Sequence, residues 1–89
     1  MKYKIQLTKK SKKDFLSLDK VIQRKITQKF RFYIFSNEPL KYAKKLKDFK
    51  FGTYRFRIGD YRAIFDIDSK GKITILVILR IKHRKEVYL

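Results

Sequence analysis

Cationic side chains that can bind phosphate gather in two stretches of this chain. In the first, Tyr54–Arg62, arginines alternate with apolar residues and a Gly-Asp pair follows Ile58. The second is the basic tail Ile81–Tyr88, which ends in Glu-Val-Tyr. Guanidinium groups donate two parallel hydrogen bonds to phosphate oxygens and stay charged at any physiological pH. Together the two stretches predict a site for the phosphates of RNA.

The net charge of the chain also favours a polyanionic partner. Its 89 residues include 25 Lys plus Arg and 8 Asp plus Glu, which gives a formal net charge of +17. These positive charges repel one another in the compact state, and nucleic acid is the first candidate for an anionic partner that compensates them. Binding of this kind weakens about a thousandfold between low and physiological salt if about six phosphates are neutralised. The alternative is a highly soluble domain without such a partner.

The inventory of reactive side chains limits the chemistry further. The chain has no cysteine, so it offers neither a disulfide nor a thiolate, and its single histidine excludes a conventional zinc site. We therefore expect no metal and no other cofactor. RNA cleavage without a metal is feasible, because the ribose 2′-hydroxyl attacks its own adjacent phosphorus. The enzyme then has to align the chain, move protons and stabilise the phosphate.

Two further side chains of the tail suit this chemistry. Histidine is the side chain best adapted to proton transfer near neutral pH, so His83 is a candidate base or hydrogen-bonding group. Tyr88 can stack on a base, since aromatic faces accept any nucleobase. The alternatives are that His83 is a plain surface residue and that Tyr88 seals the core at the C-terminus.

The sequence lacks the signals of export. Its N-terminus alternates polar and apolar residues instead of forming a continuous apolar segment, and no run approaches 18 apolar residues. A cytoplasmic protein that makes no contact with a membrane is therefore expected.

A single domain spanning residues 1–89 must position these groups, because a chain of this length supports one hydrophobic core. The alternation over Lys2–Leu7 predicts a half-buried strand. Thr8 and Asp19 are candidate N-caps of two helices, the second of which ends near Ser36–Pro39. The first helix would bury Phe15, Leu16 and Leu18, and the second a stripe of Ile22, Ile26, Phe30 and Tyr33.

After a basic connector, Leu40–Gly52, the apolar period returns to two and predicts three further strands. A two-residue turn at Gly59-Asp60 places Arg57 opposite Arg62. A second turn at Ser69–Gly71, with Asp68 opposite Lys72, would put Ile73, Ile75, Val77 and Leu79 on the core face. The other face then gathers Arg55, Arg57, Arg62, Arg80 and Lys82 around Ile64, Leu76 and Ile78. The order β-α-α-β-β-β predicts a two-layer α+β domain, an antiparallel sheet with two helices packed on one face.

The pairing of Arg57 with Arg62 has an energetic cost. Two cations about 6 Å apart repel by roughly 0.7 to 3 kcal/mol for effective dielectrics of about 80 down to 20. A phosphate chain lying on the sheet reverses the sign of this term. The alternative is that both side chains splay outward, or pair with Asp60 and Asp66.

Three segments, Glu38–Lys47, Gly52–Phe65 and Lys82–Tyr88, resemble the RelE/ParE toxin superfamily, and the match covers essentially the whole chain. The resemblance implies a RelE-like fold and a bacterial or archaeal type II toxin that a small antitoxin, encoded beside it, neutralises. The RelE branch cleaves mRNA in the ribosomal A site without a metal, whereas the ParE branch inhibits DNA gyrase. The ending of the chain favours the RelE branch.

The resemblance also implies roles for individual residues. Arg62 and Lys82 or Arg84 would stabilise the transition-state phosphate, and Arg55 and Arg57 would help with charge and proton transfer. Because arginine rarely deprotonates, His83 would take part of the general-base work. Tyr88 would stack on or orient the attacked nucleotide. The expected contacts to RNA of the ribosome are Lys44, Lys45, Lys47, Lys50 and Arg80.

The resulting hypothesis is a ribosome-dependent mRNA endoribonuclease, the toxin of a toxin–antitoxin pair. The alternatives are a ParE-like inhibitor of gyrase and a non-catalytic, basic RNA-binding domain. The antitoxin is expected to cover the cationic face, burying Ile64, Leu76 and Ile78 while its carboxylates meet the arginines.

Overall fold

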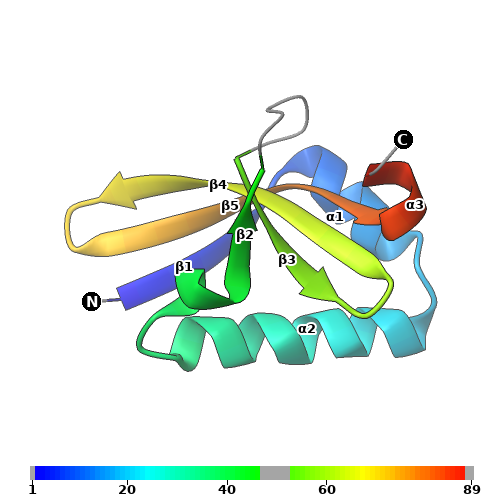
Figure 1. Cartoon of the computed structure of the whole chain (residues 1–89), viewed down its shortest axis with the longest axis horizontal. Helices are drawn as coiled ribbons and strands as arrows, with labels where there is room; N and C mark the ends of the chain where they lie inside the picture. The colour runs from blue at the N-terminus through cyan, green and yellow to red at the C-terminus, as the bar shows by residue number, and fades with distance from the viewer. Residues whose placement is uncertain (1, 47–52, 88–89) are drawn as a thin grey trace.

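The computed structural model describes residues 2–46 and 53–87 of the chain, and it confirms the α+β fold (Figure 1). The expected strands and the two expected helices occur in the expected order. Its elements are β1 (Lys2–Leu7), α1 (Lys9–Leu16), α2 (Lys20–Phe35), the 3-10 turn η1 (Pro39–Tyr42), β2 (Ala43–Lys45), β3 (Tyr54–Ile58), β4 (Tyr61–Lys70), β5 (Ile73–His83) and the short α3 (Arg84–Val87).

The five strands form one sheet in the order β1-β5-β4-β3-β2. All neighbours are antiparallel except β1 and β5, which run parallel, so the expectation of a purely antiparallel sheet is wrong. A period of two in the sequence decides which face a side chain takes, but it carries no information on the partner or direction of a strand. The three-residue β2, formed by the basic connector, was likewise not expected.

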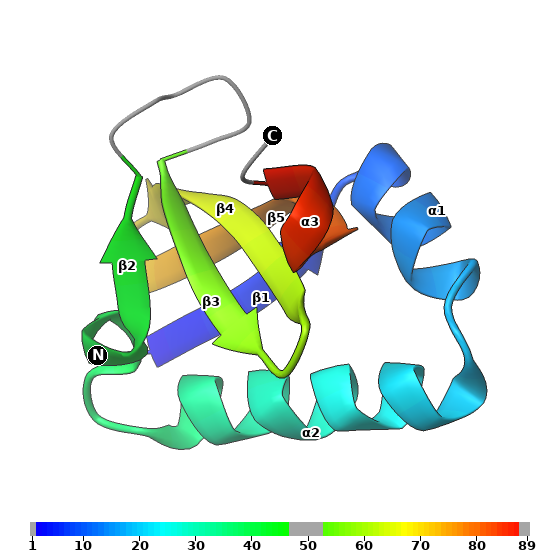
Figure 2. The same cartoon turned by 45° about the vertical axis from the view of Figure 1, so that its right-hand side comes forward.

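The apolar stripe of α2 packs against the sheet as its spacing predicts. Ile26, Phe30 and Tyr33 are buried, and Ile22 packs at the edge of the same cluster. In Figure 2, α2 lies along one side of the sheet and α1 stands at its far end. Asp19 occupies the N-cap position of α2 without a side-chain hydrogen bond.

The shorter helix α1 begins at its expected cap, because the Thr8 hydroxyl accepts a hydrogen bond from the backbone N–H of Ser11 at 3.2 Å. Phe15 and Leu18 pack against the core, whereas Leu16 is 61% exposed, so its expected burial is wrong. Residues four apart share a helix face, as Phe15 and the buried Ser11 do, and Leu16, one position after Phe15, is turned about 100° away from that face.

Stacked aromatic rings connect α2 to the centre of the sheet. The Phe56 ring centroid lies 4.0 Å from that of Tyr33 and 4.5 Å from that of Phe65, and Phe56 has no exposed surface. Because neighbouring residues of a strand point to opposite faces, this burial turns Arg55 and Arg57 to the other side of the sheet.

The expected register between β4 and β5 is wrong. The turn is Gly71-Lys72, with Lys70 opposite Ile73 and Gly71 at φ 62°, so Asp68 faces Ile75 rather than Lys72. A shift by an odd number of residues reverses a strand's faces, and Leu76 and Ile78 therefore lie in the core.

An irregularity in the same ladder restores the expected faces farther along β5. Phe65 pairs with Ile78, but the preceding Ile64 pairs with Arg80, so one extra residue is inserted in β5. Such a bulge reverses the alternation of side chains. As a result Ile81 is buried in the core, and Arg80 and Lys82 share a face with Arg62, as the sequence predicts.

Candidate phosphate-binding site

Cationic residues of three neighbouring strands form a row across the sheet. Arg57 of β3 pairs with Arg62 of β4, which pairs in turn with Lys82 of β5. Residues directly opposite each other in antiparallel strands share a face, with Cβ atoms about 4.5–5.5 Å apart. The adjacent row on this face consists of Lys44, Arg55, Ile64 and Arg80. We call these two rows the cationic face, and their juxtaposition matches the arrangement expected from the sequence.

The members of the first row differ in exposure. Arg57 is exposed and Lys82 is half-buried, whereas Arg62 is only 3% exposed. The Nη1 of Arg62 donates hydrogen bonds to the carbonyl oxygens of Gly59 and Tyr61, each at 2.9 Å, and so braces the β3–β4 turn. The charge of Arg62 is therefore buried beside the exposed guanidinium of Arg57, and it adds to the positive potential there without direct exposure to solvent.

The apolar patch expected on this face does not exist. Leu76 and Ile78 belong to the core on the opposite side, and Ile64 has no exposed surface. An antitoxin cannot bury these three side chains, and that expectation is wrong. The shifted β4–β5 register accounts for Leu76 and Ile78, whereas Ile64 lies on the expected face but is fully buried there.

Arg80 is held by an acidic residue of α1. Its Nε and Nη2 donate to the two carboxylate oxygens of Asp14 at 2.8 and 3.0 Å, and the backbone N–H of Ile81 donates to Asp14 at 3.0 Å. Burial raises the pKa of Asp14, but the hydrogen bonds from Arg80 and Ile81 and the charges of Arg80 and Lys82 outweigh it and lower that pKa. Binding of RNA by Arg80 stays a prediction.

Replacement of Asp14 by asparagine should lower the free energy of unfolding by about 1–3 kcal/mol, because charged hydrogen bonds contribute about this much. The folded-state pKa of Asp14 lies below its ordinary value of 3.8, so its stabilisation is present above that pH and is lost as the pH falls through the lowered pKa. In thermal unfolding at neutral pH, Asp14→Asn should therefore be less stable than the wild type. In acid, where Asp14 is protonated, the two proteins should have nearly equal stability.

The control for this measurement is Asp19→Asn, because Asp19 is exposed and its side chain makes no capping bond. The role assigned to the hydrogen bonds of Asp14 would be contradicted if Asp19→Asn lost as much stability as Asp14→Asn. It would also be contradicted if Asp14→Asn remained less stable than the wild type in acid.

The tail residue His83 caps α3. Its Nδ1 accepts a hydrogen bond from the N–H of Lys85 at 3.3 Å, and its own N–H donates to the carboxylate of Glu86 at 3.1 Å. This reciprocal arrangement resembles a capping box with histidine at the N-cap, except that the histidine accepts from the second helical residue instead of the third. An accepting Nδ1 places the ring proton of neutral His83 on Nε2, so Nδ1 must release Lys85 before it can take a proton.

Glu86 also contacts the cationic face, since its carboxylate lies 3.4 Å from the Nζ of Lys82. The hydrogen bond from His83 N–H lowers the pKa of Glu86, and Lys82 adds to this effect against the opposing influence of burial. Glu86 is therefore ionised at neutral pH and partly offsets the charge of Lys82.

The remaining predicted residues are dispersed. Arg84 is exposed and lies at the β3–β4 turn, where its backbone N–H donates to the carbonyl of Asp60 at 2.7 Å and its Nε lies 3.6 Å from the Asp60 carboxylate. Lys45 pairs with Tyr54 and so points away from the cationic face. Three predicted residues lie outside the described part of the chain: Lys47, Lys50 and Tyr88.

Comparisons with known proteins show the family to which the chain belongs. The model of the family "ParE toxin of type II toxin-antitoxin system, parDE" matches residues 5–88. The chain belongs to this family. Toxin RelG of Mycobacterium tuberculosis (strain ATCC 25618 / H37Rv) is 34% identical over 88 residues, which cover 99% of this chain and 98% of the relative. The resemblance to the RelE/ParE superfamily is thus confirmed.

Solved structures of toxin–antitoxin complexes share the fold. The RelBE2 complex of Mycobacterium tuberculosis matches with a TM-score of 0.70 and 30% identity, over 94% of this chain and all of the other. The archaeal RelE-RelB complex of Pyrococcus horikoshii OT3 matches with a TM-score of 0.66 and 28% identity, over 94% and 97%. The RelB-RelE complex of Methanococcus jannaschii gives 0.61 and 27%, over 93% and 94%.

Two residues that contact the candidate site, Asp14 and Glu86, are missing from the sequence prediction. Glu86 could have been found, because it stands three positions after His83, which is the spacing of a capping box, and four after Lys82. Asp14 gave no signal, since its partner Arg80 lies 66 residues away in the sequence. Within residues 2–46 and 53–87, no three acidic or histidine side chains are grouped to hold a metal, and no helix is long and apolar enough to span a membrane.

Proposed function

We propose that this toxin cleaves mRNA on translating ribosomes in the cytoplasm, without a metal, and that a cognate antitoxin neutralises it. The observation that carries the proposal is the row of Arg57, Arg62 and Lys82 across three strands. The solved relatives that share the fold are toxins in complex with antitoxins, which supports the second part.

The proposed reaction is an internal attack on phosphorus. The 2′ oxygen of the ribose forms a bond to the adjacent phosphorus while the bond to the 5′ oxygen breaks, which leaves a 2′,3′-cyclic phosphate and a 5′-hydroxyl. Negative charge gathers on the phosphoryl oxygens, and preorganised donors that meet it lower the barrier. Arg57 would donate to these oxygens directly, and Arg62 would add its field from below.

Protons must leave the 2′-hydroxyl and reach the departing 5′ oxygen. We assign the second transfer to Lys82, because an ammonium can give up a proton whereas a guanidinium rarely does. We assign the first to His83, whose Nδ1 would have to release the Lys85 N–H. Arg55 and Arg84 would add charge, Tyr88 would stack on the nucleotide, and the basic connector with Lys44 and Lys45 would contact ribosomal RNA.

Inhibition of DNA gyrase is the second candidate function. The observation that favours it is the matching family model, which describes ParE toxins. A gyrase inhibitor needs no proton-transfer groups, so substitution of His83 would leave its activity unchanged.

One pair of assays separates the two functions. The purified toxin is added to ribosomes translating a defined mRNA, and the 5′ ends of the RNA are mapped; in parallel it is added to gyrase with relaxed plasmid. New 5′ ends that require ribosomes, with normal supercoiling, would support cleavage. Blocked supercoiling with intact mRNA would overturn the proposal in favour of gyrase.

A further inference from the structure

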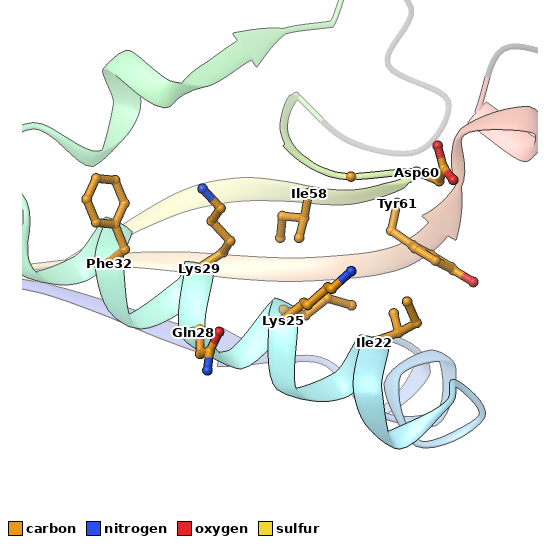
Figure 3. A pocket seen from close by; sticks show the side chains of 10 residues that line it. Ile22, Lys25, Gln28, Lys29, Phe32, Ile58, Asp60 and Tyr61 are labelled. Atoms are coloured by element: carbon orange, nitrogen blue, oxygen red, sulfur yellow. The ribbon is translucent and has the colours of Figure 1, made fainter.

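A groove of about 500 Å³ separates α2 from the β3–β4 hairpin (Figure 3). Three isoleucines line it, Ile22 and Ile26 from α2 and Ile58 from β3. Lys25 and Lys29 point from α2 toward the hairpin and form its rim, as Figure 3 shows. We call this cavity the α2–hairpin groove. Its lining combines an apolar floor with a cationic edge on α2, and the acidic residue in its lining, Asp60 at the hairpin turn, lies 3.6 Å from the guanidinium of Arg84.

The groove lies on the opposite side of the hairpin from the cationic face. Ile58 belongs to the core side of β3, and the preceding Arg57 points to the other side. A molecule in the groove therefore binds without covering the first row of cations.

Helix α2 carries positive charge that nothing within the helix offsets. It contains five cations and no acidic residue, and its first turn lacks the acidic side chain that favours a helix N-terminus. Lys25 and Lys29 stand four positions apart, where like charges on a helix repel. A partner with carboxylates at this rim would turn that repulsion into attraction.

Exposed aromatic rings extend the apolar surface beyond the groove. Phe32, at its end, is 50% exposed, and its ring lies 5.2 Å from that of Tyr42, which is 39% exposed. Phe35, one helical turn farther, is 83% exposed. A contiguous apolar surface of this kind with a charged rim is typical of a protein-binding site, whereas phosphate contacts use polar groups.

We infer that the α2–hairpin groove holds an acidic, amphipathic segment of the cognate antitoxin, with apolar side chains on the half-buried Ile22 and the exposed Phe32 and carboxylates at Lys25 and Lys29. The inference rests on the proposed function for the existence of that antitoxin. From Ile22 to Phe32 the groove follows ten residues of helix, about 15 Å, which a short segment of the partner spans. The groove thus takes the place of the antitoxin surface predicted from the sequence, Ile64, Leu76 and Ile78, whose side chains are buried.

The test uses the protein encoded by the gene adjacent to the toxin's own gene. The toxin is prepared as wild type, as Lys25→Glu/Lys29→Glu and as Phe32→Ala, and dissociation constants are measured by calorimetry at two salt concentrations. The matched control is Lys9→Glu/Lys13→Glu, since these lysines are exposed on α1 at the same spacing of four residues. Circular dichroism checks that each variant is folded.

The expected result is a loss of affinity of at least about tenfold for the α2 charge variant and for Phe32→Ala, with less than about threefold for the control. Equal losses in both charge variants would mean attraction to net charge only and would overturn the inference, as would unchanged binding in all variants. Weaker ribosome binding with unchanged affinity for the adjacent-gene protein would assign the groove to RNA and overturn it too. If the wild type binds through the groove but leaves mRNA intact, the inference stands and the proposed cleavage fails.

Discussion

Substitution of Arg57 by alanine is expected to slow ribosome-dependent mRNA cleavage about 10²–10³-fold, the usual effect of removing one preorganised donor to a developing oxyanion. Arg57 is the exposed end of the row with Arg62 and Lys82, so it is the guanidinium that a phosphate meets first. The fold should survive, because the side chain lies in solvent and its removal relieves repulsion from Arg62. Single-turnover cleavage on stalled ribosomes measures the effect.

The matched control is Arg31→Ala, which removes the same exposed side chain from α2, away from the cationic face. It should reduce cleavage by less than about threefold. Equal rates for Arg57→Ala and the wild type would exclude Arg57 from the reaction, and equal losses in both variants would indicate a response to total charge alone. A Lys substitution at position 57 should restore part of the rate, since it returns the charge without the planar fork.

Replacement of Phe56 by alanine is expected to cost about 3–5 kcal/mol of unfolding free energy, the range for truncating a buried aromatic residue. Its ring has no exposed surface and stacks between Tyr33 of α2 and Phe65 of β4. A loss of this size is a large part of the 5–15 kcal/mol that holds an ordinary domain together. Urea denaturation followed by circular dichroism measures it.

The comparison for Phe56→Ala is Phe35→Ala, which truncates a ring that is 83% exposed. That change should stay within about 0.5 kcal/mol, as surface substitutions usually do. If both variants lost stability equally, the stack would not be the core of the fold. Because Phe56 stands between Arg55 and Arg57, its loss should also weaken cleavage through the displacement of strand β3.

Local signals explain what the sequence predicts well. The spacing of Ile22, Ile26, Phe30 and Tyr33 fixes the buried stripe of α2, and the two-residue turn at Gly59-Asp60 fixes Arg57 opposite Arg62. Both depend on residues within a few positions of one another. The pairing of Arg57 with Arg62 in the candidate site can therefore be predicted from the sequence alone.

Long-range pairing explains what the sequence does not predict. Nothing in Lys2–Leu7 specifies that β1 runs parallel to β5, and nothing near Asp14 specifies its bond to Arg80. The β4–β5 ladder shows how errors can cancel. Because the predicted turn is misplaced, Leu76 and Ile78 lie on the face opposite to the predicted one. The bulge before Arg80 reverses the alternation for the residues that follow it, so Arg80 and Lys82 lie on the predicted face despite the incorrect register.

The strands at the two borders of the sheet bear on self-association. An outer strand leaves backbone groups available to pair with another copy, and lysine side chains oppose such pairing. Here β1 carries Lys2 and Lys4 and β2 carries Lys44 and Lys45, and any second molecule that docked at either border would bring like charges together. Lysine at both borders thus opposes pairing of the toxin with further copies of itself, and the same excess of lysine contributes to the positive charge to which we assign RNA binding.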